Sequence, residues 1–105
     1  MPKFLVHTSY TAEGLKILQK EGATGRMKRI AAMLEGAGGK LESYYFALGE
    51  DDAIIICDMP SLEAMCAVAI SGSASGVLRT RTTALLTVKE TDRALKKSAG
   101  VKVTR

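Results

Sequence analysis

The single histidine of this chain, His7, lies in a stretch of β-branched and aromatic residues, KFLVHTSY, at positions 3–10. Side chains alternate along a strand, so His7 shares one face with Leu5 and Ser9. An imidazole titrates near neutral pH and can act as a general acid or base or as a polar anchor. His7 is therefore the candidate catalytic residue and Ser9 a candidate ligand-binding residue, while a structural role for a lone histidine stays open.

Two arginines form a paired cationic feature later in the chain. Arg79 and Arg81 lie two residues apart in VLRTRTTALLTV, a β-branched stretch typical of a strand, which places both on one face. If that face lines a cleft, the pair can hold a carboxylate or phosphate through bidentate hydrogen bonds. If it faces solvent or a subunit edge, the arginines form salt bridges with acids such as Asp52.

Two adjacent tyrosines and a hairpin acid complete the candidate ligand-binding residues. Tyr44 and Tyr45 point to opposite faces of one strand, so one of them faces the interior. That tyrosine either orients a ligand through its hydroxyl or fills core volume. Asp52 ends the polar stretch GEDD at the mouth of the next strand. We interpret GEDD mainly as a hairpin turn, because its glycine can take a positive φ.

No metal or cofactor is expected from these residues. One histidine cannot form a histidine pair, and Cys57 and Cys66 lack the close spacing of a zinc site. Both cysteines are interpreted as small buried hydrophobes in a reducing compartment. The segment SGSASG at 71–76 lacks the Gly-Lys-Ser/Thr ending of a phosphate loop, so it predicts a close-packed turn that stops the preceding helix.

Hydrophobic periodicity and turn residues predict the elements that position these side chains. A long helix should begin after the N-cap Thr11 and break between Gly22 and Gly25, and a second should begin after Ser61. Strands are predicted at 3–10, 40–48, 52–58 and 77–88, with a final short helix at 89–98. This order predicts an α+β, ferredoxin-like βαββαβ domain over residues 1–90, with a four-stranded antiparallel sheet and its crossover helices on one face. Residues 91–105 are the end of the last helix and a basic tail.

The strand at 52–58 is apolar on both faces, which bears on assembly. Ala53, Ile55 and Cys57 point one way, whereas Ile54 and Ile56 point the other. On the preceding strand, Leu41 and Tyr45 are expected on one side, opposite Tyr44 and Phe46. Helices cover only one face, and monomers seldom expose a large apolar patch. We therefore predict a homodimer whose sheets face each other.

The second predicted helix also has almost no polar face, because it reads SLEAMCAVAIS. A helix that is apolar all round is buried all round. Two covers remain open. The first helix and the C-terminal helix can cover it within one subunit, or it can form a second contact between subunits.

Charge and hydropathy limit the partners. The net charge of +4 belongs to the residues after 88, where six basic residues stand against two acids, while residues 1–88 carry nine of each sign. These scattered basic residues lack interleaved aromatics, so nucleic acid is an improbable partner. No apolar run approaches the length of a membrane span, and the N-terminus lacks the apolar segment of a secretory signal. A cytoplasmic location is expected.

Three segments together resemble the GYD domain family of small bacterial proteins. They are SYTAEG at 9–14, GGKLESYYFALGEDD at 38–52 and SGVLRTRTTALLT at 75–87, in the family's order. The resemblance covers about residues 3–90 and implies a dimeric α/β barrel, in which the sheets of two subunits pair. In the triplet that names the family, Gly49 and Asp52 match the ends, and Asp51 stands in place of tyrosine.

Two functions follow from these observations. The first is a homo-oligomeric small-ligand-binding or accessory protein with a cleft between facing sheets, since an apolar surface with sparse polar groups is the usual make-up of a ligand site. The alternative is a cofactor-independent enzyme, of oxygenase or isomerase type, acting on a small aromatic or carbonyl compound. In that case His7 is the base, and Arg79 or Arg81 stabilises developing charge.

Overall fold

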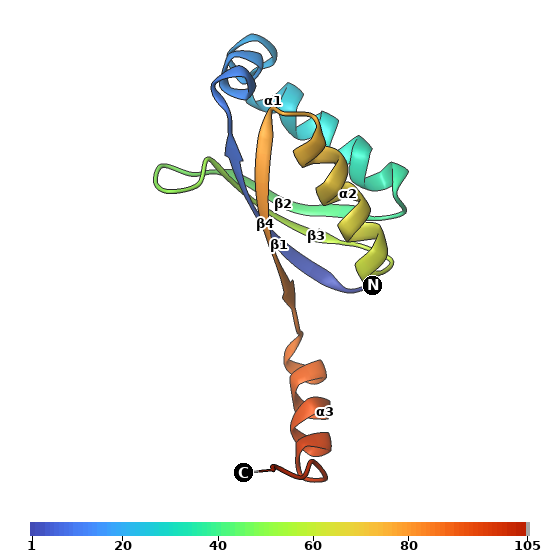
Figure 1. Ribbon diagram of the computed structural model, residues 1–105. Helices are drawn as coiled ribbons and strands as arrows, with labels where there is room; N and C mark the ends of the chain where they lie inside the picture. The colour runs from blue at the N-terminus through green and yellow to red at the C-terminus, as the bar shows by residue number, and fades with distance from the viewer. Residues whose placement is uncertain (105) are drawn as a thin grey trace.

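Seven elements follow one another along residues 1–104, which are the residues that the computed structural model describes (Figure 1). They are β1 (Lys3–Tyr10), α1 (Ala12–Gly36), β2 (Lys40–Phe46), β3 (Ala53–Asp58), α2 (Leu62–Ala74), β4 (Leu78–Leu85) and α3 (Val88–Ser98). The strands form one antiparallel sheet in the order β2-β3-β1-β4. This order confirms the predicted α+β, ferredoxin-like fold.

The core lies between α1, α2 and one face of the sheet, and Figure 1 shows both helices on that side. Burial alternates residue by residue along β1 and β3, as the period of a strand requires. The buried side chains come from both layers: Phe4, Val6, Ile55 and Cys57 from the sheet, and Ile30, Leu34 and Met65 from the helices. The other face of the sheet, which we call the bare face, carries Leu5, His7, Ile54 and Ile56, and α1 and α2 do not cover it.

The hairpin between β2 and β3 is confirmed, but its details differ from the prediction. The strands end at Phe46 and begin again at Ala53, so the loop spans residues 47–52 and is longer than GEDD. A bulge between Leu41 and Ser43 shifts the register of β2. Because of this bulge, Leu41 packs against the helix-side core beside Tyr44, and its predicted position on the opposite face was wrong.

The predicted glycine break in α1 is confirmed at Gly22, whose φ of 79° is not helical. The prediction that SGSASG stops α2 was wrong in position. The helix continues through Ser71 and Gly72 to Ala74 and ends where Gly76 takes a φ of 79°. Gly72 is tolerated inside the helix because Leu78 packs close to it, where a Cβ would crowd the leucine methyl.

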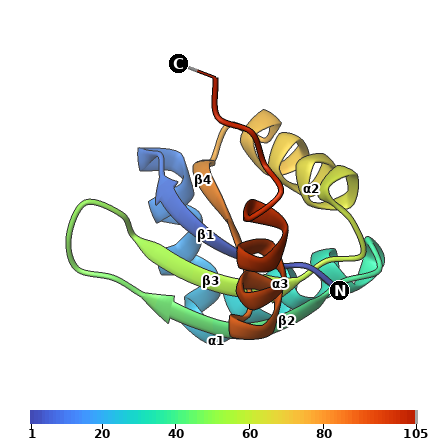
Figure 2. The same cartoon turned by 90° about the horizontal axis from the view of Figure 1, so that it is seen from below.

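The C-terminal helix α3 does not cover α2. One alternative from the sequence had α3 help to cover α2 within one subunit, and that part of it was wrong. α3 continues from the end of β4 away from the domain, and none of its residues is buried (Figures 1 and 2). The outer side of α2 therefore stays open, with Leu62 68% and Ile70 63% exposed. The N-terminus of α3 is well formed, because Thr87 and Glu90 make a reciprocal capping box.

The two cysteines differ in environment, and Cys66 contradicts the prediction that both are buried. Cys57 lies fully inside the core, whereas Cys66 is exposed on the outer side of α2. Burial raises the pKa of the Cys57 thiol to about 11. We expect a maleimide at pH 7.5 to label Cys66 rapidly and Cys57 at least about 100-fold more slowly, because thiolate and access are both scarce at Cys57.

Mass spectrometry of peptides at timed quenches measures both labelling rates. The Cys66→Ser variant should lose the fast phase and keep the slow one. Equal labelling rates at the two cysteines in the native protein would contradict this assignment of their environments.

Candidate functional site

A polar cluster lies on the bare face near the β2–β3 loop. The strand register places one row of residues across all four strands: Tyr45, Ile54, His7 and Arg81. Ser9 lies opposite Arg79 in the next row of the same face. The sequence placed His7 with Ser9 and Arg79 with Arg81, and the register of β1 with β4 brings both pairs to the same face.

Asp51, from the β2–β3 loop, connects this cluster. Its Oδ2 lies 2.7 Å from Arg81 Nη2 and 3.1 Å from His7 Nδ1, and Ser9 Oγ donates a hydrogen bond of 3.2 Å to its Oδ1. The Asp51 side chain is only 15% exposed. A sheltered carboxylate of this kind needs partners for both oxygens, and Ser9 and Arg81 supply them.

Neighbouring side chains stabilise the negative charge of Asp51. The hydrogen bond from Arg81 holds the pKa of Asp51 below its usual value of 3.8, and the Ser9 hydroxyl acts in the same direction. A carboxyl with a lowered pKa in the folded state stabilises the fold at pH values above its unfolded value. This contribution disappears only as the pH falls through the lowered pKa, so Asp51 is ionised at neutral pH.

Asp52 has a structural role instead. Its carboxylate accepts a hydrogen bond of 2.8 Å from the backbone N–H of Tyr10, and its own N–H donates to the Thr8 carbonyl at 2.9 Å. These bonds fasten the loop to β1 and so place Asp51 over the sheet. The acid that pairs with Arg81 is therefore Asp51, and the sequence analysis, which named Asp52 as an example, missed it.

His7 is a member of this cluster with a ring nitrogen that lacks a hydrogen-bond partner within the described residues. Its Nδ1 is buried and lies near Asp51, but the ring N–H is not aligned for a hydrogen bond. A carboxylate beside one ring nitrogen orients an imidazole. The arrangement can therefore anchor a polar ligand atom or accept a proton from one.

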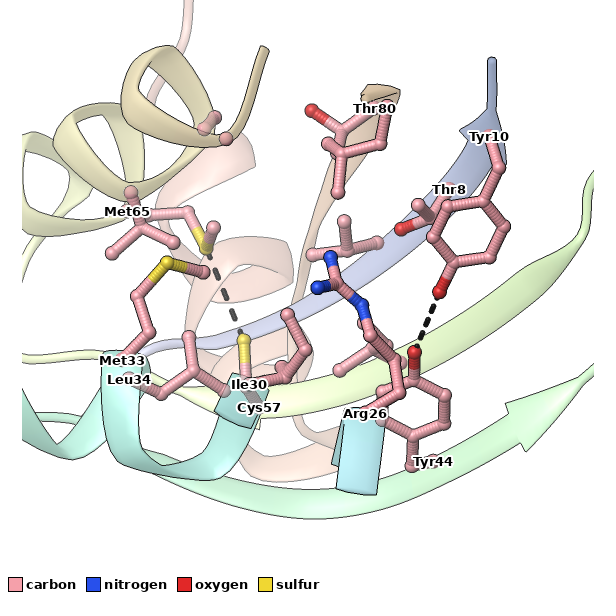
Figure 3. Close-up of a pocket in the computed structure, with 16 residues that line it drawn as sticks. Thr8, Tyr10, Arg26, Ile30, Met33, Leu34, Tyr44, Cys57, Met65 and Thr80 are labelled. Atoms are coloured by element: carbon pink, nitrogen blue, oxygen red, sulfur yellow. Dashed lines mark hydrogen bonds between the residues drawn. The ribbon is translucent and has the colours of Figure 1, made fainter. Parts of the chain in front are cut away.

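The two tyrosines separate as predicted. Tyr45 lies on the bare face and is 68% exposed, whereas Tyr44 points to the helix side, where its hydroxyl lies 2.9 Å from the Tyr10 hydroxyl (Figure 3). Burial raises the pKa of Tyr44 above its ordinary value, so this phenol is neutral at physiological pH. Tyr44 is therefore outside the His7 cluster and belongs to a separate pocket under the helices.

That pocket contains Arg26, which the sequence analysis also missed. Arg26 stands four residues before Ile30 in α1, on the helix face that covers the sheet. A charged residue on the apolar face of an amphipathic helix was the signal available in the sequence.

Within residues 1–104, no group of three or more His, Cys, Asp or Glu side chains is placed to hold a metal ion. The helices described are also all too short or too polar to cross a bilayer.

Comparison with protein families gives a match. The model of the family described as GYD domain matches residues 4–95, which include all of the sheet except Lys3 and both covering helices. No curated protein matches the chain.

Proposed function

This chain belongs to the GYD domain family, and we propose that it is a homo-oligomeric small-ligand-binding protein whose ligand lies between the facing sheets of two subunits. The observation that carries the proposal is the cluster of His7, Ser9, Asp51 and Arg81 on the bare face. A charged network around a sheltered carboxylate, beside the apolar residues Leu5, Ile54 and Ile56, is the composition of a ligand site with a few convergent polar groups.

The second copy is supported by surfaces that one subunit leaves open. Leu5, Ile54 and Ile56 on the bare face are only partly buried in the single subunit, and they form a contiguous apolar area beside the cluster. Helix α3 has only 11 residues and buries none of them, with Leu95 exposed on its apolar side. A helix this short is marginal in water unless tertiary packing supports it. An identical subunit covers the sheet by a two-fold contact and supplies a surface for α3.

The ligand proposed for this cleft is a small aromatic or carbonyl compound. Arg79 makes no ion pair or hydrogen bond through its side chain within residues 1–104, so its guanidinium can donate to a ligand oxygen. His7 supplies the second polar contact, and Ile54 provides apolar surface between β1 and β2. The interface thus encloses a site that recognises a ligand with one oxygen-containing group on an apolar body.

The single histidine makes this site simple to test. Native mass spectrometry at micromolar concentration should show a dimer, and ring-proton signals of His7 should shift during a titration with 4-hydroxyacetophenone, a phenolic ketone. We expect Asp51→Asn to weaken that binding by about 10-fold, because it removes the charged partner of Arg81 and the negative charge that orients His7.

The matched control is Glu50→Gln, which removes the neighbouring loop charge from an exposed residue whose side chain makes no hydrogen bond or ion pair in residues 1–104. It should bind like the wild type. A monomer, unshifted His7 signals, or equal weakening by both variants would contradict the proposed cleft.

A second candidate function is an enzyme that needs no cofactor and acts on a compound of the same class. The His7–Asp51 pair favours it, because an imidazole oriented by a neighbouring carboxylate is an arrangement used in general base catalysis. The His7→Ala variant separates the two functions: product formed by the wild type and lost in His7→Ala, with the dimer intact, indicates turnover. Tight binding with no product indicates a binding protein.

A further inference from the structure

The helix-side pocket lies inside each subunit, between α1, α2 and the face of the sheet opposite the bare face (Figure 3). It consists of a cavity of about 40 Å³ and a wider opening of about 320 Å³, which share Tyr10, Arg26, Ile30 and Met33. The inner part is lined mainly by apolar side chains, including Leu34, Cys57 and Met65. The two volumes form one pocket with an apolar inner end and a polar mouth.

Arg26 occupies the mouth without adequate partners. Its side chain is 13% exposed, and its Nε is buried with no hydrogen-bond partner within the described residues. The nearest carboxylate oxygen, Glu21 Oε1, lies 3.7 Å from Nη1, and the same carboxylate lies closer to Arg29, at 3.1 Å.

The cationic group of Arg26 lies instead over the ring of Tyr10, with Cζ 5.6 Å from the ring centroid. This contact stabilises the charge but is not a hydrogen bond, so it gives the buried Nε–H no acceptor. A guanidinium stays charged at all physiological pH values, and a buried donor without an acceptor is costly. A ligand oxygen can supply that acceptor.

The tyrosine pair adds a donor at the same place. Tyr10 and Tyr44 share one hydrogen bond between their hydroxyls, so one hydroxyl hydrogen is left to donate elsewhere. Burial raises the pKa of Tyr44, so its hydroxyl keeps its own hydrogen at neutral pH. Figure 3 shows the guanidinium of Arg26 beside the two hydroxyls.

We propose that this pocket is a second ligand site, separate from the cleft at His7, and that it binds a small carboxylate with an apolar body. The carboxylate accepts a bidentate pair of hydrogen bonds from Arg26 and a third from the tyrosine pair. The apolar body lies against Ile30, Met33 and Met65. A phosphate dianion fits less well, because one guanidinium shared with nearby Glu21 cannot neutralise it.

Benzoate and its neutral isostere benzamide test the proposal on the intact chain labelled with methyl-¹³C methionine. We expect saturable benzoate binding below about 10 mM. The methyl signals of Met33 and Met65 should move, while Met1 and the His7 ring stay unchanged. Benzamide should bind at least about 10-fold more weakly, because it lacks the charge that Arg26 recognises.

Substitutions identify the recognising group. Arg26→Gln should weaken benzoate binding by about 10- to 100-fold, whereas the exposed Lys28→Gln, which removes the same charge from the same helix, should leave it unchanged. Tyr44→Phe should weaken it by less. His7→Ala should have no effect, so the failure of the cleft and the failure of this pocket are distinguishable.

Several outcomes would overturn this site. They are no binding of benzoate by the wild type, equal binding of benzamide, movement of the His7 signals in place of the methionine signals, or equal affinity in Arg26→Gln and Lys28→Gln. The comparison of benzoate with benzamide needs only the wild-type protein, so a variant that fails to fold does not decide the question.

Discussion

Replacing Gly14 with alanine should lower the free energy of unfolding by about 3 kcal/mol. Gly14 is buried in the first turn of α1, and a Cβ at this position would overlap the backbone carbonyl oxygen of Val77. That carbonyl cannot easily move, because it accepts a hydrogen bond of 3.0 Å from the Thr11 N–H. Thr11 in turn caps α1 and donates from Oγ1 to the Gly76 carbonyl at 3.1 Å. The added methyl group must therefore separate the start of α1 from the start of β4.

Gly25→Ala is the matched control in the same helix. A Cβ there would meet nothing closer than the Glu21 Cβ at 3.7 Å, so alanine fits without a clash. It should raise the free energy of unfolding by about 0.5–1 kcal/mol, because glycine loses more conformational freedom on folding. Urea unfolding followed by circular dichroism measures both variants. Equal and small effects would show that the contact between α1 and Val77 is not close.

The fold was largely predictable because the strands alternate so regularly. The period of two in KFLVHTSY and AIIICD is a local property of the chain, and it separates Ala53, Ile55 and Cys57 from Ile54 and Ile56 without knowledge of the partners. The bulge at Leu41 was not predictable in the same way. The bulge depends on how β2 pairs with β3, and no single residue in LESYY indicates it.

Helix ends and helix docking were harder to predict. SGSASG contains residues that favour turns, but α2 extends through Gly72 because Leu78 packs against that position from β4. The final helix was expected to help cover α2 on the basis of composition alone. Its direction depends on the short connection after Leu85, which carries no pattern that fixes an angle.

The candidate sites show the same division between local and long-range information. His7, Ser9 and Arg81 converge because strand period and topology are enough to put them on one face. The choice between Asp51 and Asp52 depends on the backbone bonds that hold the loop, which adjacent identical residue types cannot reveal. Arg26, at the mouth of the helix-side pocket, differs from Asp51 in this respect. Its position on the face of α1 that covers the sheet was visible in the sequence.

Replacing Ile54 with glutamate should weaken the proposed dimer by at least about 100-fold. Ile54 lies between Tyr45 and His7 in the row that crosses the bare face. A two-fold contact places every substitution twice, so each dimer would desolvate two carboxylates without partners. In the single subunit this side chain points away from the helix-side core, so we expect the fold and its thermal unfolding to be nearly unchanged.

Leu48→Glu is the control for the added charge, because Leu48 lies in the hairpin loop and is 98% exposed. It introduces the same side chain on the same hairpin but outside the apolar area of the bare face. Sedimentation velocity over a concentration series should show a monomer for Ile54→Glu and a wild-type dimer for Leu48→Glu. A dimer that persists unchanged in Ile54→Glu would place the subunit contact elsewhere, and the open outer side of α2 with Leu62 and Ile70 would then be the surface to substitute next.

Because His7 is the neighbour of Ile54 in the same row, loss of the dimer should also remove the ligand-induced shift of the His7 signals, which links assembly to the cleft in one experiment.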